Sequence, residues 1–352
     1  MMFARDGRSD FSLTGRPATS RQTEEVKLSP RLCSCLAGLL AAAFLAVPAA
    51  AQQSYPSKPI RLVLNVGTGG VGDITNRLFA EHLSRSMGQQ IVVDNRPSAG
   101  GTAAQAAVVN AAPDGYTLVQ TGNASAISAS LFKKPPYDVL NQFAPVSTLG
   151  IFQMGLVVTP ESGFGSLGDL LAYARKNPGK LDIGTINVGS TQYLAAELLK
   201  FTAKIEAQTV PFKSNTLLYT SLRGNEVRVA FDLIGPLLPQ IRGGQLKALA
   251  VGSSKRFSGL PDVPTFTEGG VAGFDDVASW TGTSAPAKTP AAILDRLSKE
   301  IAKAAALPEV GQRLQEMGIE ARASTPEETR KRLATDIARW NKVIDQAKIE
   351  RQ

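Results

Sequence analysis

The sequence predicts an α/β fold, because short apolar strands alternate with helical segments from residue 55 onward. The alternation runs through two rounds that resemble each other. In the first round the segment LNVGTGG (residues 64–70) precedes a helix, and in the second round INVGSTQ (residues 186–192) precedes one. The repeated order of strand, small-residue loop and helix predicts two α/β units.

The first round is expected to consist of three strands and two helices. Apolar spacing predicts a helix at residues 73–87, with Ile74, Leu78, Phe79 and Leu83 on one side. The remaining elements are strands at 59–66, 90–95 and 116–121 and a small-residue helix at 100–112.

The second round begins with a helix at residues 166–179, for which Ser166 is the N-cap and Gly179 the residue beyond the C-terminus. A long returning strand is expected at 277–290, and three helical stretches close the chain at 291–306, 308–317 and 326–348. Between them we expect strands at 180–186, 207–212, 226–234 and 245–253 and helices at 189–203, 216–224 and 235–244.

The N-terminus carries the pattern of a cleavable signal peptide. An apolar run at residues 32–51 follows Lys27 and Arg31 and ends in small residues at 49–51. Residues 1–30 are long and mixed in charge for such a leader, so Val26 is a candidate for the true start of translation. The sequence therefore predicts an exported protein that begins at residue 52.

Both cysteines, Cys33 and Cys35, lie inside this leader. A mature chain without cysteine has no disulfide, no thiolate nucleophile and no zinc–thiolate site. Acylation at Cys35 is the alternative, but the apolar run follows the cysteines instead of preceding them.

The chain is basic, with a formal net charge of +8. The leader contains six basic and four acidic residues, so 8 − 6 + 4 leaves +6 on the remaining 352 − 51 = 301 residues. These charges are dispersed, and no basic cluster is interleaved with aromatic residues, which argues against a nucleic-acid partner. A moderate positive field favours small anionic solutes.

The glycine-rich loop can also be compared with dinucleotide-binding loops. Gly67, Gly69 and Gly72 fit the G-x-G-x-x-G spacing after a strand, and Asp94 lies where the ribose-binding acid is expected. An export signal and a second equivalent loop argue against a nicotinamide cofactor, and the sequence predicts no cofactor. The two loops instead predict two helix N-termini that face one cleft and hold an anion from both sides.

Catalytic and metal-binding patterns are weak. His82 is the only histidine, and it lies inside a predicted helix, where packing is the expected role. Trp280 is expected to pack at the strands that join the two units, and Arg96 to form an internal ion pair. Asp232, at the end of an apolar strand, is interpreted either as a cap or as a group that orients a ligand or closes the cleft.

Several blocks of sequence resemble a known family in order and spacing. They are YPSKPIRLVLNVGTGGVGDITNRL, VVDNRPSAGGTAAQAAVVNAAPDGYTL, LFKKPPYDVLNQFAPVS, LPDVPTFTEGG and SWTGTSAPAKTP. Over the chain from about residue 55 these blocks resemble the Bug (TctC-like) substrate-binding proteins of tripartite tricarboxylate transporters. The resemblance implies a type II Venus-flytrap fold of two α/β domains joined by two hinge strands, with residues 52–158 plus 277–352 as domain 1 and 159–276 as domain 2.

The resemblance also implies a ligand site made of four segments. By position, the contacts to a ligand carboxylate would come from Thr68, Gly69, Gly70 and Asp73, from Asn123, Ala124 and Ser125, from Gly189, Ser190 and Thr191, and from Asp232.

This sequence departs from the family pattern in both loops. Asn65 and Val66 replace the family's Pro-Phe, which removes an aromatic wall; the second loop has Asn187 and Val188, and Tyr193 stands where histidine is common. These departures leave the identity of the ligand open.

The function implied is that of a monomeric periplasmic protein that captures a small carboxylate without catalysis. A di- or tricarboxylate, an amino acid and an aromatic acid all remain possible ligands. The expected partners are the membrane subunits of a transporter or a sensor kinase. The alternative is an exported α/β enzyme that uses Asp73 or Asp232 as acid or base.

Overall fold

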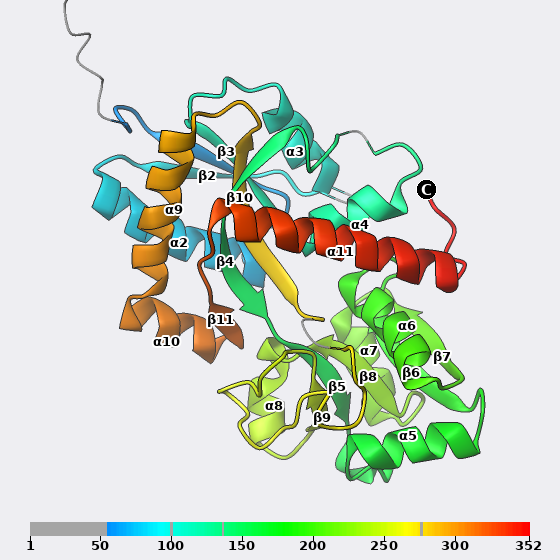
Figure 1. Cartoon of the computed structure of the whole chain (residues 1–352). Coiled ribbons are helices and arrows are strands. Elements are labelled where there is room, and N and C mark those ends of the chain that lie inside the picture. The colour runs from blue at the N-terminus through cyan, green and yellow to red at the C-terminus, as the bar shows by residue number, and fades with distance from the viewer. Residues whose placement is uncertain (1–54, 99–100, 136, 275–276) are drawn as a thin grey trace, which may run out of the picture. The chain divides into compact units, whose positions relative to one another are not determined.

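The computed structural model describes residues 55–98, 101–135, 137–274 and 277–352. The expected signal peptide, with Val26, Cys33 and Cys35, lies outside these described residues. Within them the chain forms two β-sheets flanked by helices (Figure 1). The first sheet has the strand order β11-β4-β10-β3-β1-β2 and the second β7-β6-β8-β5-β9.

The first sheet combines parallel and antiparallel strands. Its strand β1 pairs in parallel with β2 and β3, and β10 pairs antiparallel with β3 and β4. Its elements are β1 (Ile60–Leu64), α2 (Val71–Met87), β2 (Ile91–Asn95), α3 (Thr102–Val109), β3 (Thr117–Gly122), α4 (Asn123–Leu131), β4 (Phe143–Phe152), β10 (Ser279–Pro286), α9 (Ala291–Ala305), α10 (Pro308–Glu316), β11 (Ile319–Ala321) and α11 (Pro326–Gln346).

The second sheet is built in the same way. Its strand β6 pairs in parallel with β7 and β8, and β5 pairs antiparallel with β8 and β9. Its elements are β5 (Met154–Val158), η2 (Pro160–Ser162), α5 (Leu167–Lys176), β6 (Leu181–Ile186), α6 (Thr191–Ala203), β7 (Ala207–Phe212), α7 (Asn215–Arg223), β8 (Val229–Leu233), η3 (Gly235–Leu237), α8 (Leu238–Arg242) and β9 (Lys247–Val251).

The two sheets share one topology, since β2-β1-β3-β10-β4 corresponds to β7-β6-β8-β5-β9. In the first sheet the antiparallel strand β10 returns from far along the chain, whereas in the second sheet the antiparallel strand β5 comes first in chain order. The chain crosses to the second sheet at Gln153, between β4 and β5, and returns between β9 and β10. The loops after β1 and β6 therefore hold equivalent positions at the carboxyl ends of parallel strands, where ligands bind in open α/β sheets.

The two strands on either side of the crossing, β4 and β5, are buried on both faces. Every residue of β4 and β5 is buried, as expected for strands covered by helices on both sides. Helix α11 runs beside α4 and also contacts α6 (Figure 1). On α11, Trp340 is fully buried, which ties the C-terminal helix to the core.

Sequence patterns predicted most elements but missed α4, β4, β5 and β11. The three C-terminal helices are confirmed as α9, α10 and α11. Residues 123–131, expected to be a loop at their start, form α4, whose alanines and serines give only a weak apolar periodicity. Strand β4 was not predicted, and the helix expected at 100–112 is shorter, as α3. Strand β5 pairs within the second sheet, so sheet membership changes at Gln153 and not after residue 158.

The two sheets approach each other closely beside the crossing. Gly235, after β8, is buried, and a Cβ atom there would lie 2.0 Å from the backbone oxygen of Met317 at the end of α10. We expect Gly235→Ala to lower the free energy of unfolding by about 1–3 kcal/mol, because backbone must move to admit the methyl group. Urea unfolding followed by circular dichroism measures the change.

Gly311→Ala is the matched control, since a Cβ atom at this position of α10 meets nothing within 4 Å. There alanine should stabilise by about 0.5–1 kcal/mol through helix propensity. Equal effects of the two substitutions would contradict the close approach.

Candidate functional site

A cavity of about 670 Å³ lies between elements of the two sheets. Three segments form most of its wall. Residues 65–66 follow β1, residues 124–132 belong to α4 and its end, and residues 186–192 join β6 to α6. Two of the three segments thus come from the equivalent loops that the sequence singled out.

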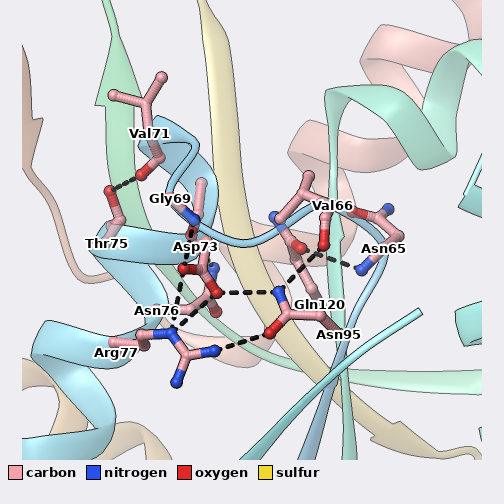
Figure 2. A network of polar contacts seen from close by, with 11 residues as sticks. Asn65, Val66, Gly69, Val71, Asp73, Thr75, Asn76, Arg77, Asn95 and Gln120 are labelled. Carbon is pink, nitrogen blue, oxygen red and sulfur yellow. Dashed lines mark hydrogen bonds and ion pairs between the residues drawn. The ribbon is translucent and has the colours of Figure 1, made fainter. Parts of the chain in front are cut away.

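Asp73 holds the glycine-rich loop from behind (Figure 2). Its carboxylate accepts hydrogen bonds from the backbone N–H of Gly69 at 2.9 Å, from Asn95 Nδ2 at 2.8 Å and from Arg77 Nε at 2.9 Å. Burial would raise the pKa of Asp73, but the bonds from Arg77, Gly69 and Asn95 outweigh it and lower the pKa. Asp73 therefore stays charged and folds the loop back onto the first turn of α2.

The start of the same loop is held by two amide side chains. Gln120 Oε1 accepts the backbone N–H of Asn65 at 3.2 Å, and Asn95 Nδ2 donates to the backbone oxygen of Val66 at 3.0 Å (Figure 2). Gln120 is itself fixed by a 2.9 Å bond from Nε2 to Thr281 Oγ1 on β10. Residues 65–66 consequently enter the cavity wall in one defined conformation.

The side chain of Asn65 is available for a ligand. The residue is 8% exposed and lines the cavity, and its side-chain amide makes no hydrogen bond with the described residues. Gly101 packs against it, since a Cβ atom at Gly101 would lie 2.7 Å from Asn65 Nδ2. A buried amide without a protein partner is a strong candidate for a ligand contact.

The second loop forms the N-terminus of α6. Ser190 is the N-cap: its hydroxyl oxygen accepts the N–H of Tyr193 at 3.0 Å and donates to the backbone oxygen of Ile186 at 2.6 Å. The backbone N–H groups of Thr191 and Gln192 have no acceptor among the described residues. They line the cavity with the partial positive charge of a helix start.

Asp232 supports this second loop as Asp73 supports the first. Its carboxylate accepts bonds from Gln192 Nε2 at 2.9 Å, Asn215 Nδ2 at 2.6 Å and the Tyr219 hydroxyl at 2.7 Å. The residue is 1% exposed. Burial and the neighbouring Asp232 carboxylate raise the pKa of Tyr219, which keeps its hydroxyl a donor.

One hydrogen bond joins α4 to α6 across the cavity's edge. Asn123 Nδ2 donates to Thr191 Oγ1 at 2.8 Å, and Asn123 Oδ1 accepts from Trp340 Nε1 at 3.0 Å. Ser125, which is fully buried, accepts a bond from Gln105 Nε2 at 3.2 Å. Residues 123–125, expected in a loop, thus form the first turn of α4.

The residues expected to bind ligand divide into three groups. Ala124, Gly189, Ser190 and Thr191 line the cavity. A second group is buried and supports the lining residues without lining the cavity itself: Asp73, Asn123, Ser125 and Asp232. The third group is exposed and lies outside the lining: Thr68, Gly69 and Gly70.

The sequence analysis missed lining residues that the fold brings together. The sequence showed that Asn65 and Val66 depart from the family pattern. This departure indicated that the cavity wall differs here from that of other family members. On α4, Ile127 and Leu131 are four residues apart and both reach the cavity. Their spacing is helical, but the helix itself was not predicted.

The cavity lining contains no charged side chain or histidine among the described residues. Val66, Ile127, Leu131, Ile186 and Val188 make much of it apolar. No group of acidic, histidine or cysteine residues that could hold a metal ion occurs in the described ranges. No helix in the part of the chain that the structure describes is long and apolar enough to cross a membrane.

The remaining residues singled out by sequence lie outside the cavity lining. His82 is half-buried on α2, away from the cavity lining. Trp280 is 2% exposed and donates its Nε1–H to Asp336 Oδ2 at 2.7 Å, so it packs as expected. The expected ion pair of Arg96 is formed with Asp94, at 3.0 Å from Nε to Oδ2.

Acidification should weaken the hold of Asp73 on the loop. Because its pKa is lowered on folding, its contribution to stability is complete above the unfolded pKa of about 3.9 and is lost as the pH falls through the folded pKa. We expect Asp73→Asn to cost about 1–3 kcal/mol of unfolding free energy at neutral pH. The difference from wild type should shrink in urea titrations at successively lower pH.

Asp295→Asn, which removes an exposed i,i+4 ion pair on α9, is the control and should change stability by less than about 0.5 kcal/mol. A difference between Asp73→Asn and wild type that does not vary with pH would contradict the assignment.

Comparison with known proteins agrees with the fold. The model of the family described as "Tripartite tricarboxylate transporter family receptor" (TctC) matches residues 75–349. Protein BugT of Bordetella pertussis is 33% identical over 317 residues, covering 89% of this chain and 96% of that protein.

Solved structures of similar proteins extend over nearly the same region. The periplasmic binding protein BugD is 29% identical with a TM-score of 0.68, covering 85% of this chain and 100% of its own. Rpa4515 of R. palustris, solved with adipate, is 31% identical with a TM-score of 0.70, covering 84% and 99%. MatC from Rhodopseudomonas palustris, with bound malate, is 29% identical with a TM-score of 0.67, covering 82% and 100%. The chain belongs to the TctC family of tripartite tricarboxylate transporter receptors, the Bug-type periplasmic binding proteins, and has their two-lobed Venus-flytrap fold.

Proposed function

We propose that this protein captures a small carboxylate in the 670 Å³ cavity and releases it chemically unchanged. The observation that carries the proposal is the helix start at Thr191 and Gln192, where unpaired N–H groups line the cavity. Two relatives of this fold were solved with dicarboxylates, adipate and malate. A carboxylate is the ligand group that such N–H groups hold best.

Three kinds of donor are available to the carboxylate. The N–H groups of α6 supply charge-assisted hydrogen bonds, Asn65 supplies an amide that has no partner within the described ranges, and Thr191 can donate its hydroxyl hydrogen while its oxygen accepts from Asn123. Each hydrogen bond to a charged group contributes about 1.5–3 kcal/mol. Two or three such bonds offset the loss of ligand freedom on binding.

The rest of the wall favours an uncharged, apolar ligand body. Among the described residues no cationic side chain lines the cavity, so a second or third carboxylate would lose its hydration without an ion-pair partner. The apolar side chains of Ile127, Leu131 and Val188 instead suit a hydrocarbon chain or ring. Among the ligand classes that the sequence left open, an aromatic acid with one buried carboxylate fits best.

The buried polar residues hold other protein groups in place. We assign Asp73 to the fold of the first loop, Asp232 to the N-termini of α6 and α7, and Asn123 to the contact between α4 and α6. Residues 68–70 shape the same loop without reaching the ligand in this arrangement. Both carboxylates that an enzyme would use as acid or base are occupied by protein donors, which favours a receptor over an exported enzyme.

The setting of this receptor follows from the leader and the family. We propose export to the periplasm through residues 1–51, with the two sheets and the helices that flank them as the two lobes. A monomer would deliver its ligand to the membrane subunits of a transporter or to a sensor kinase. The gene neighbourhood distinguishes these two partners.

Asn65→Leu and Thr191→Val test the assigned donors. Titration calorimetry with benzoate, adipate and malate should show the tightest binding for an acid with an apolar body, and no binding of the neutral amide benzamide. Each substitution should weaken binding of the preferred acid about tenfold to a hundredfold. The acid should be recovered unchanged from the incubation by mass spectrometry.

Thr216→Val, an exposed threonine on α7 outside the cavity, is the control and should bind like wild type. Wild-type affinity in both cavity variants, or conversion of the acid into a product, would overturn the proposal.

A further inference from the structure

A second, smaller cavity of about 280 Å³ lies where the chain crosses between the two sheets. It is separate from the carboxylate cavity and shares no lining residue with it. Its wall combines Gln153 at the crossing, Glu320 and Arg322 beside β11 of the first sheet, and residues 253–258 after β9 of the second. Both lobes therefore contribute to it.

The lining of this crossing cavity is positively charged. Lys255, Arg256 and Arg322 face one acid, Glu320, so the lining charge is 3 − 1 = +2. Arg322 pairs with Glu320, and Arg256 pairs with Glu268 outside the lining, whereas Lys255 has no carboxylate partner among the described residues. The net positive charge of the lining, with Lys255 as its cation without a carboxylate partner in the described ranges, attracts a small anion.

Neutral donors lie in the same wall. The backbone N–H groups of residues 253–256 have no hydrogen-bond acceptor among the described residues, and the Ser254 hydroxyl likewise has no partner there. Consecutive free N–H groups next to cationic side chains are typical of oxyanion sites. Gln153 is 2% exposed, and its buried Oε1 has no donor in the described structure.

We propose that this crossing cavity binds a tetrahedral oxyanion, for which inorganic phosphate is the probe. Its oxygens accept from Lys255 and residues 253–256 on one side and from Arg322 on the other. The bound anion joins Arg322 of the first lobe to Lys255 of the second.

Because the anion contacts both lobes, its binding is coupled to their arrangement. Any coupling between two ligands is reciprocal, so phosphate that favours one lobe arrangement changes carboxylate affinity by the same factor as carboxylate changes phosphate affinity. The binding of phosphate itself does not require the carboxylate cavity to function.

Titration calorimetry of the purified protein with inorganic phosphate, without any carboxylate, tests the site directly. We expect one phosphate per chain, competition by sulfate, and no equivalent effect of chloride at matched ionic strength. Lys255→Gln should weaken phosphate binding about tenfold, and Lys255→Gln with Arg322→Gln should abolish it. Lys342→Gln, which removes an exposed charge from α11, is the matched control and should bind like wild type.

The outcomes separate this inference from the proposed function. Asn65→Leu, which removes no hydrogen bond between the lobes, should keep wild-type phosphate affinity even though it weakens carboxylate binding. No phosphate binding in the wild type, equal weakening in Lys342→Gln and Lys255→Gln, or an effect of phosphate that chloride reproduces would each overturn the crossing site. Failure of carboxylate binding alone would leave the phosphate result unchanged.

Discussion

Two buried carboxylates hold the two loops that border the cavity between the lobes. Asp73 accepts bonds from Gly69, Asn95 and Arg77 beneath the first loop, and Asp232 accepts from the first turns of α6 and α7 beneath the second. Each is almost inaccessible to solvent, so removing its partners would leave a buried charge without compensation, which costs several kcal/mol. The charge of each acid is thereby directed to the protein's own donors, and the donors that remain free at the cavity wall are neutral.

This division explains how a site without a cationic side chain can select an anion. The wall offers N–H groups at the start of α6 and the amide of Asn65, all fixed before a ligand arrives. Fixed dipoles in a partly dehydrated cavity need no reorganisation when a carboxylate binds, so each bond retains more of its free energy. An apolar wall without compensating charges then discriminates against ligands that carry a second charge inside the cavity.

The sequence predicted the two-lobed α/β fold because strand and helix periods are strong where elements are apolar, as in α9 and α11. It missed α4, since Ala and Ser give little periodicity, and β4, whose pairing with β10 is set by residues more than a hundred positions away. The family pattern identified the second loop, where Gly189, Ser190 and Thr191 line the cavity. In the first loop, Gln120 and Asn95 hold the backbone of Asn65 and Val66, which line the cavity, whereas residues 68–70 lie outside its lining; their contact with a ligand stays a prediction.

The bond from Asn123 to Thr191 is a direct hydrogen bond between α4 of one lobe and α6 of the other. A hydrogen bond between neutral groups contributes only about 0.5–1.5 kcal/mol, which shifts an equilibrium by roughly tenfold at most. In the proposed site, a carboxylate that bonds to Asn65 of one lobe and to the α6 N-terminus of the other adds charge-assisted bonds between the lobes, each worth about 1.5–3 kcal/mol. Differential binding of this kind is the physical condition for closure, and it also sets how readily the ligand can leave.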